Sequence, residues 1–332
     1  MRIKELDVFR GLAAISVVLY HYTTRYNKIF DSSYSVNLKY GWLGVPVFFI
    51  LSGFVIYLTV NKSEDALDFL KRRFIRLYPT FWVCLLITLG VEAFTGYFIN
   101  EISVKDILMN FTMFHQFFGF EHVDGAYWSL LPELLFYLLM AFLMSIHRVK
   151  DYYLFNGILL FIGLIHLYFP IPIGGKLLSI HYILLFMIGI AFYRIYVNQG
   201  KWLDYLYILL NYILSAPLYF VEHPSTSLTF LYTAFGFIIL IYYLFVKGYF
   251  GFLSNFKVFL YIGNISYALY LIHENIGYII INKTEIYVGR SLSIVIALTI
   301  AIALASLITY KVEPLVKPIL RKLLFKNESS GQ

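Results

Sequence analysis

The chain has 332 residues, of which 60% are hydrophobic and only 14% are charged, with a mean hydropathy of +0.75. Soluble domains carry about a quarter of charged residues, so this composition excludes an ordinary soluble domain and indicates a polytopic membrane protein. Basic cytoplasmic loops are enough to explain the net charge of +7, and we expect no nucleic-acid partner.

About ten apolar runs are long enough to cross the ~30 Å hydrocarbon core of a bilayer as helices. In chain order they cover residues 8–26, 40–60, 77–96, 127–146, 152–169, 177–197, 202–220, 228–247, 258–281 and 290–312. Most connections are short, and no linker, repeat or low-complexity tract divides the chain. We therefore predict an all-α fold, a single bundle of about ten transmembrane helices over residues 1–332, with a short cytoplasmic tail at 313–332.

The basic residues predict the orientation, because cytoplasmic loops carry an excess of Lys and Arg. With the N-terminus in the cytoplasm, 19 of the 26 Lys and Arg residues lie on the inner side. The outer side then holds Arg25, Lys28, Lys39, Lys105, Lys176, Lys283 and Arg290. Both termini are predicted to be cytoplasmic, the connection 97–126 faces outward, and the expected location is a cell membrane, in bacteria the cytoplasmic membrane.

The first run, LDVFRGLAAISVVLYHY at residues 6–22, contains Arg10 and His21, which are costly to place in a membrane. The eleven helical steps between them amount to about three turns plus ~20°, with a rise of about 16 Å. The two side chains therefore share a helical face, and His21 lies about half a bilayer deeper. A hydrogen bond between helices explains His21 alone as well as a functional role does.

A basic cluster, Lys71, Arg72, Arg73 and Arg76, begins the third run. Arg73 and Arg76 are three residues apart and are predicted to share a helical face. Contact with anionic lipid headgroups explains such a cluster. A clamp for phosphate groups explains it too, because arginine forks bind phosphate through paired donors. The residue chemistry alone favours the lipid interpretation.

Two further runs carry polar residues at helical spacing. The fourth run contains Ser129, Glu133 and Tyr137 at intervals of four, and the ninth contains Ser266, Tyr270 and His273. Either stripe alone is typical of hydrogen bonding between helices. Together with the first run, they bring two histidines and a carboxylate into one bundle, which predicts a polar cavity inside it.

These residues and their order resemble the membrane-bound acyltransferase family 3 over nearly the whole chain. The first run is similar to the opening of that family, with ten residues between Arg10 and His21. The further segments that resemble the family in order are GVPVFFILSGF (44–54), RRFIRLYP (72–79), YWSLLPELLFY (127–137), IGNISYALYLIH (262–273) and VEPLVKP (312–318). Where family members often have two acidic residues, this chain has LPELL, so the resemblance carries over a role only to Glu133.

The resemblance implies an enzyme that transfers an acetyl or other small acyl group from cytoplasmic acyl-CoA to a hydroxyl of an extracytoplasmic or lipid-linked glycan. His21 is then the general base, with Glu133 as a second catalytic residue, and direct attack and an acyl-histidine intermediate both stay open. Residues expected to hold the CoA phosphates are Arg10, Arg72, Arg73 and Arg76. Residues expected to bind substrate are Ser129, Tyr137, Ser266, Tyr270 and His273.

The expected partners are acyl-CoA as donor substrate, the glycan acceptor and membrane lipids, with no tightly bound cofactor. We expect no metal site, since the single cysteine, Cys84, offers no thiol cluster. A transporter would also place His, Glu and Arg in a bundle, although the inverted repeats and broken helix pairs of transporters are not found. A non-catalytic accessory of polysaccharide export is the other alternative. The oligomeric state, monomer or homo-oligomer, is left open.

Overall fold

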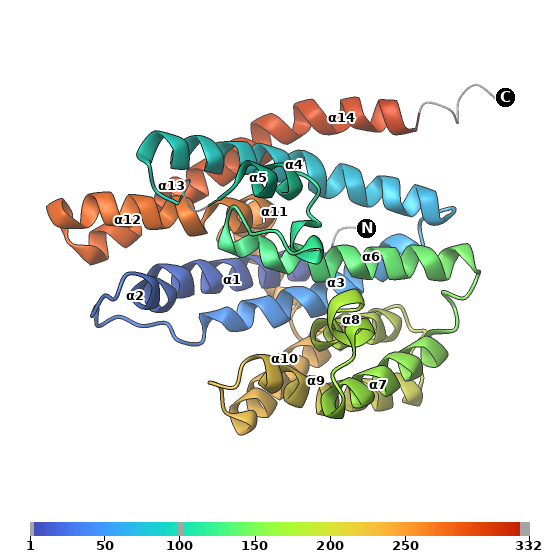
Figure 1. Cartoon of the computed structure of the whole chain (residues 1–332). Helices are drawn as coiled ribbons and strands as arrows, with labels where there is room; N and C mark the ends of the chain where they lie inside the picture. Colours follow the sequence, from blue (N-terminus) through green and yellow to red (C-terminus); the bar gives the residue numbers. More distant parts are fainter. Residues whose placement is uncertain (1–2, 99–101, 326–332) are drawn as a thin grey trace. The chain divides into compact units, whose positions relative to one another are not determined.

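The computed structural model describes residues 3–98 and 102–325, and these residues form helices and turns without any strand. The predicted all-α fold is therefore confirmed for this part of the chain (Figure 1). Residues 326–332 of the predicted cytoplasmic tail lie outside the described residues. The chain divides into two compact units, which are described separately.

The first unit contains residues 1–6, 45–70 and 132–256. Its helices are α3 (Gly44–Val60), α6 (Leu130–Ser145), α7 (Tyr152–Tyr168), α8 (Ile180–Tyr196), α9 (Trp202–Glu222) and α10 (Leu228–Val246). Two glycines let α3 and α8 approach closely, because a Cβ at Gly53 would lie 2.0 Å from the Phe186 carbonyl oxygen and one at Gly189 would lie 1.9 Å from that of Ile50. Small residues at helix crossings are the usual means of such close packing in membranes.

The second unit contains residues 7–44, 71–131 and 257–332. Its helices are α1 (Lys4–Tyr20), α2 (Tyr26–Ile29), α4 (Ala66–Thr95), α5 (Val104–Asn110), α11 (Lys257–Ile272), α12 (Glu274–Val288), α13 (Arg290–Leu307) and α14 (Glu313–Leu324). A π-helical turn, His21–Arg25, joins α1 to α2, and α12 and α13 run side by side (Figure 1). The predicted run 258–281 is therefore not one helix, because it is interrupted at His273.

Close packing of α1 against α11 sets the position of the polar residues in the second unit. A Cβ at Gly263 would lie 1.9 Å from the carbonyl oxygen of Asp7, and one at Gly11 would lie 2.4 Å from that of Phe259. Neither glycine can be replaced without moving a backbone. The two helices therefore lie in backbone contact near the start of α1, and the end of α1 is brought toward the end of α11.

Six helical stretches of the described chain are long and apolar enough to cross a membrane. They are Gly41–Val60, Ala66–Thr95, Gly125–Ser145, Trp202–Glu222, Leu228–Val246 and Arg290–Leu324. Two shorter apolar helices, α7 and α8, coincide with two more of the predicted runs, and a third, α11, covers the first part of the predicted run 258–281. These helices agree with a membrane protein, but the predicted number of about ten spans is not confirmed.

Candidate functional site

The site is built where α1 and α11 end. His21 is the first residue of the π-helical turn after α1, and His273 is the single residue between α11 and α12. The hydroxyl of Tyr22 donates to the backbone carbonyl of His273 at 2.9 Å, which joins the π-helical turn to the helix break. π-Helical turns are often found at functional sites.

The hydrogen-bond partners of His273 and His21 determine which ring nitrogen of each histidine carries the proton. Nδ1 of His273 lies 2.7 Å from the carbonyl oxygen of Tyr270, and because a carbonyl can only accept, this nitrogen carries the proton. In a neutral ring Nε2 is then bare, and it lies 2.9 Å from Nδ1 of His21, which must donate to it. The carbonyl oxygen of Val17, 3.0 Å from the same Nδ1, requires the same assignment. The network therefore assigns to neutral His21 a bare Nε2.

A carboxylate faces that bare nitrogen. Nε2 of His21 lies 3.5 Å from Oε2 of Glu274, and the side chains of the two residues are 13% and 7% exposed. The other oxygen of Glu274 accepts from the hydroxyl of Tyr278 at 3.3 Å. A proton taken up by His21 would be stabilised by this carboxylate at once, which is the environment that a general base requires.

The connection before α6 closes the site on the side of Glu274. Asp124 accepts from the backbone N–H of Ala126 at 2.9 Å and from that of Asn275 at 3.0 Å, so it ties this connection to the first turn of α12. Burial and the neighbouring Glu274 raise the pKa of the Asp124 carboxyl. The next residue, Gly125, packs directly on Glu274, because a Cβ there would lie 2.6 Å from Oε1.

Two of the other predicted substrate-binding residues meet in the second unit. The hydroxyl of Ser129 donates to the hydroxyl of Tyr270 at 2.9 Å, so the fourth and ninth predicted runs are in contact here. Ser266 instead donates to the carbonyl of Gly263 in its own helix at 2.8 Å.

The predicted stripe Ser129, Glu133 and Tyr137 is only partly correct. Ser129 lies in a 3-10 turn before α6, where helical spacing differs from that of an α-helix, and it belongs to the second unit. Glu133 and Tyr137 belong to the first unit, where the Tyr137 hydroxyl donates to Oε1 of Glu133 at 2.5 Å. Ser52 donates to the same oxygen at 3.5 Å.

The arginines of the predicted phosphate clamp differ in their exposure to solvent. Arg73 is only 4% exposed, whereas Arg76 is exposed, so of these two arginines of α4 only Arg76 is open to solvent. Arg72 and Arg76 are the exposed pair, four residues apart on one face of α4. Arg10 forms an ion pair with Asp7 at 2.9 Å.

One group of side chains among the described residues has donor atoms in reach of a common metal ion. These atoms, from His21, His273 and Glu274, lie within 4.8 Å of one another. Two His nitrogens and a carboxylate are a donor set that zinc enzymes use. Binding through Nε2 of His273 would, however, break its hydrogen bond from His21. The chain's own hydrogen bonds already satisfy this nitrogen.

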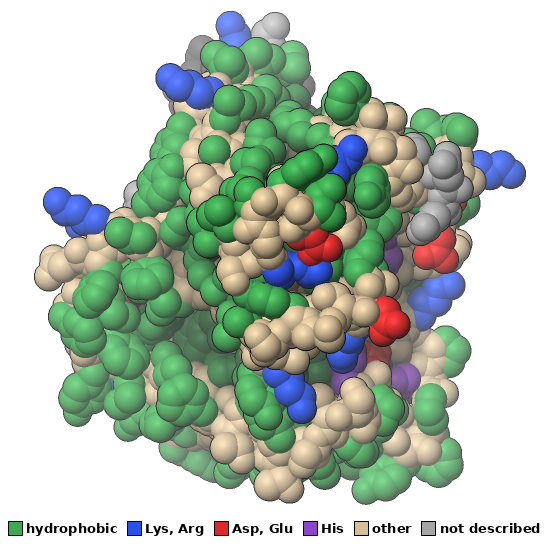
Figure 2. Space-filling model, turned by 90° about the vertical axis from the view of Figure 1, so that its left-hand side faces the viewer, with side chains coloured by type: hydrophobic (Ala, Val, Ile, Leu, Met, Phe, Trp, Pro, Cys, Tyr) green, Lys and Arg blue, Asp and Glu red, His purple; other side chains and the backbone are tan. Residues whose placement is uncertain are grey.

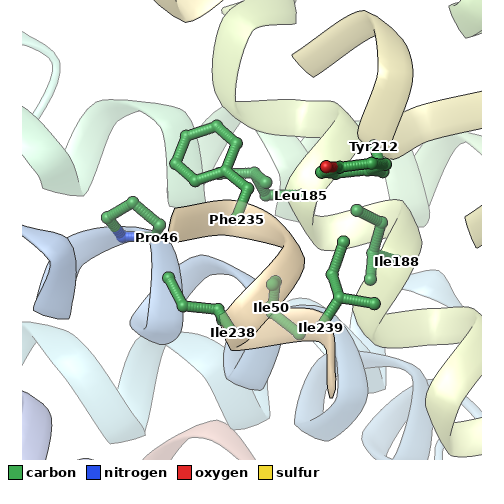
Figure 3. A pocket seen from close by; sticks show the side chains of 8 residues that line it. All are labelled: Pro46, Ile50, Leu185, Ile188, Tyr212, Phe235, Ile238 and Ile239. Carbon is green, nitrogen blue, oxygen red and sulfur yellow. The ribbon is translucent and has the colours of Figure 1, made fainter. Parts of the chain in front are cut away.

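Figure 3 shows a different kind of pocket, a small one in the first unit. Its lining includes Pro46, Leu185, Phe235 and Ile238, and its only polar group is the hydroxyl of Tyr212, which donates to the carbonyl of Tyr232. The pocket offers no acid or base and is not a candidate for the chemistry.

Comparison with known proteins identifies the family. The family model described as an acyltransferase domain, Acyl_transf_3, matches residues 3–310. The chain belongs to the acyltransferase 3 family. The resemblance seen in the sequence motifs is thereby confirmed, and the protein is an acyltransferase.

Individual relatives agree with this assignment. The acyltransferase is 27% identical over 80% of its length to ORF330 of Acidianus two-tailed virus, which is named as an acetyltransferase, and the match covers 80% of that protein. It is 25% identical over 43% of its length to Nodulation protein 10 of Rhizobium leguminosarum bv. viciae, of which 45% is covered. It is 30% identical over 44% of its length to the O-acetyltransferase OatA of Staphylococcus aureus, of which 25% is covered. No solved structure matches significantly.

Sequence reasoning missed the part of the site around Glu274. The run HEN at residues 273–275 was a usable signal, since three adjacent polar residues interrupt an otherwise apolar stretch. Asp124 and Gly125 gave no such signal, because their role depends on a connection that returns to α12.

Charged groups also meet at the surface of the acyltransferase. Figure 2 shows a face that is covered mainly by hydrophobic side chains, on which acidic and basic side chains lie close together with His side chains beside them.

Proposed function

We propose that this acyltransferase moves an acetyl or other small acyl group from acyl-CoA to a hydroxyl of an extracytoplasmic or lipid-linked glycan, with His21 as the general base. The observation that carries the proposal is the position of His21, whose Nδ1 lies 2.9 Å from Nε2 of His273 and whose Nε2 lies 3.5 Å from Oε2 of Glu274. The name of OatA supports O-acetylation, and that of ORF330 supports acetyl as the acyl group.

The reaction needs one base and no redox partner. Nε2 of His21 takes the proton of the acceptor hydroxyl while the hydroxyl oxygen attacks the thioester carbonyl. An ester C–O bond forms, the thioester C–S bond breaks, and CoA leaves as a thiolate that takes the proton from His21. Attack by His21 itself, followed by transfer from an acyl-histidine, gives the same products. The carboxylate of Glu274 would stabilise the imidazolium in either route.

On the donor side we propose that Arg72 and Arg76 bind the CoA phosphates, with Arg10 and Arg73 supporting them. The exposure of Arg72 and Arg76 supports this assignment, because a ligand in solution can reach them. Exposed arginines would bind anionic lipid headgroups equally well, so substitution must separate the two interpretations.

On the acceptor side we propose that the hydroxyl enters past the connection 97–126, which the distribution of basic residues predicts to face outward. Gly125, near the end of this connection, packs on Glu274 and so lies next to the base, which supports entry from this side. The path of the acceptor would be lined by Ser129, Tyr270 and His273. In the first unit, Glu133 is still proposed as a catalytic residue and Tyr137 as a substrate-binding residue. Cytoplasmic termini and a cell-membrane location belong to the same proposal.

The test is label transfer by the purified protein in nanodiscs. Acetyl-CoA carrying a labelled acetyl group is supplied with a saccharide acceptor, and ester-bound label is released from the saccharide by mild base. We expect label in the saccharide only when protein, donor and acceptor are all present. Absence of transfer across a panel of envelope saccharides, by protein that binds acetyl-CoA, would argue against the proposed acceptor class.

A further inference from the structure

We propose that His273 is a positioning residue for His21: it holds the His21 ring with Nε2 toward Glu274 and shares the positive charge that forms on that ring during transfer. This inference rests on the proposed function, because it assigns a role in the same reaction. Neither the family match nor the names of the relatives assign a role to His273.

The position of His273 is fixed from three sides. Its side chain is 0% exposed, its Nδ1–H donates to the Tyr270 carbonyl at 2.7 Å, and its own carbonyl accepts from the Tyr22 hydroxyl at 2.9 Å. Tyr22 reaches the helix break because residue 277 is glycine, and a Cβ there would lie 2.2 Å from the Tyr22 ring. A buried ring that is held at one nitrogen can present only Nε2 to His21.

The fixed direction of the hydrogen bonds selects one tautomer of His21. If His21 carried its proton on Nε2, its bare Nδ1 would face the bare Nε2 of His273 at 2.9 Å and the carbonyl oxygen of Val17 at 3.0 Å. Three acceptors would then meet without a proton among them, which leaves buried groups unsatisfied and is unfavourable. With the proton on Nδ1, both neighbours of that nitrogen are satisfied, and the acceptor hydroxyl can bind at Nε2, beside Oε2 of Glu274 at 3.5 Å.

The same bond becomes stronger during the reaction. Before transfer, a neutral His21 donates to a neutral His273. Once Nε2 of His21 has taken the hydroxyl proton, the ring is an imidazolium, and the bond from its Nδ1–H to His273 is charge-assisted. An interaction that strengthens only as the transition state is reached raises kcat rather than substrate affinity.

This arrangement differs from a Ser-His-Asp triad. There a carboxylate holds Nδ1 of the histidine and stabilises its charge from that side. Here a neutral imidazole holds Nδ1, and the carboxylate, Glu274, lies on the side of Nε2. Two adjacent residues of the helix break therefore lie at the two ring nitrogens of His21, His273 at Nδ1 and Glu274 near Nε2.

Three substitutions separate this role from a merely structural one. His273→Phe keeps an aromatic ring at this position but offers no acceptor to His21. His273→Gln places an amide oxygen near the position of Nε2, whereas His273→Asn reaches only the position of Nδ1. We expect the Phe and Asn variants to lose about 10- to 150-fold in kcat, the effect of one charge-assisted hydrogen bond, with the KM for acyl-CoA within about twofold. The Gln variant should recover most of the lost rate.

Nitrogen-15 NMR of the histidine-labelled protein in nanodiscs detects the hydrogen bond between His21 and His273 without any enzymatic turnover. We expect His21, assigned with His21→Gln, to show a protonated Nδ1 and a bare Nε2, and its Nδ1 signal to shift in His273→Phe but little in His273→Gln. Tyr212→Phe in the first unit is the control, because it removes a hydroxyl that likewise donates to a backbone carbonyl, that of Tyr232, and leaves both imidazoles and the residues around them in place. It should retain the His21 signal and most of the kcat.

The inference is overturned if His21 carries its proton on Nε2, if its Nδ1 signal is the same in His273→Phe as in the parent, or if Phe, Gln and Asn lower kcat equally. The NMR result does not depend on acyl transfer. A protein that transfers no acyl group but shows the predicted His21 signals would refute the proposed function and confirm the hydrogen bond.

Discussion

Replacement of Gly125 by alanine tests the pairing of His21 with Glu274 through a single methyl group. The new Cβ would lie 2.6 Å from Oε1 of Glu274, whereas ordinary van der Waals contact begins at 3.4 Å. The carboxylate must therefore retreat by about 0.8 Å, since the methyl group is fixed to the backbone. The backbone of Gly125 has no positive φ, so alanine adds no local strain of its own.

The retreat has a calculable effect on the charged form of His21. Unit charges 3.5 Å apart, the present distance between Nε2 of His21 and Oε2 of Glu274, attract by about 5 kcal/mol at an effective dielectric constant of ~20. If the whole displacement lengthens this distance to ~4.3 Å, the attraction falls to about 4 kcal/mol. The difference of about 1 kcal/mol corresponds to roughly a fivefold loss of kcat.

The assay is steady-state release of CoA thiol by purified protein in nanodiscs, with donor and acceptor varied in turn. We predict a roughly fivefold lower kcat for Gly125→Ala and an unchanged KM for acyl-CoA. Gly90→Ala on α4 is the matched control, because a Cβ there meets nothing within 4 Å and should leave kcat unchanged. A Gly125→Ala protein with the parent kcat would refute the role given to Glu274.

Two other predictions concern the donor side and the orientation. Arg76→Lys should raise the KM for acyl-CoA about 10-fold or more while the KM for the acceptor stays constant, because lysine keeps the charge but loses the paired donors that bind a phosphate. An unchanged KM for acyl-CoA would show that Arg76 does not bind the donor and would favour contact with lipid headgroups. In a variant without Cys84, a cysteine at Lys105 should react with an impermeant thiol reagent in intact cells and one at Lys322 should not, and the opposite labelling pattern would reverse the proposed orientation.

The sequence predicted the helical class and most helix positions, because long apolar runs leave few alternatives to a helix in a membrane. It did not predict the interruption at His273, where an apolar run continues on both sides. The break depends on tertiary contacts, namely the Tyr22 hydroxyl on the His273 carbonyl and the Asp124 carboxylate on the N–H of Asn275. Residues from three distant segments are in contact there, and no local sequence pattern predicts contacts between distant segments.

The candidate site, too, could be predicted only in part from the sequence, because some of its contacts join distant segments of the chain. His21 and His273 are polar residues in apolar runs, and such residues are expected to form hydrogen bonds inside a bundle. The sequence therefore indicates that both residues have polar partners. The polar run at 273–275 marks Glu274 as unusual in an apolar stretch, but it does not predict the contact with His21, because that contact depends on the helix break at His273. The burial of Arg73 was missed because a helical spacing of three gives a shared face but does not say which side of that face packs inward.

The central claim, that His21 is the base, is tested most directly by the rate of acyl transfer in His21→Gln. Glutamine keeps polar atoms at this position but cannot take the proton, and we predict a loss of about 10²- to 10⁴-fold, the usual contribution of a general base. His147→Asn is the control, since His147 is exposed with a φ of 55° that asparagine tolerates. A folded His21→Gln protein that transfers the acyl group as fast as this control would contradict the proposed mechanism.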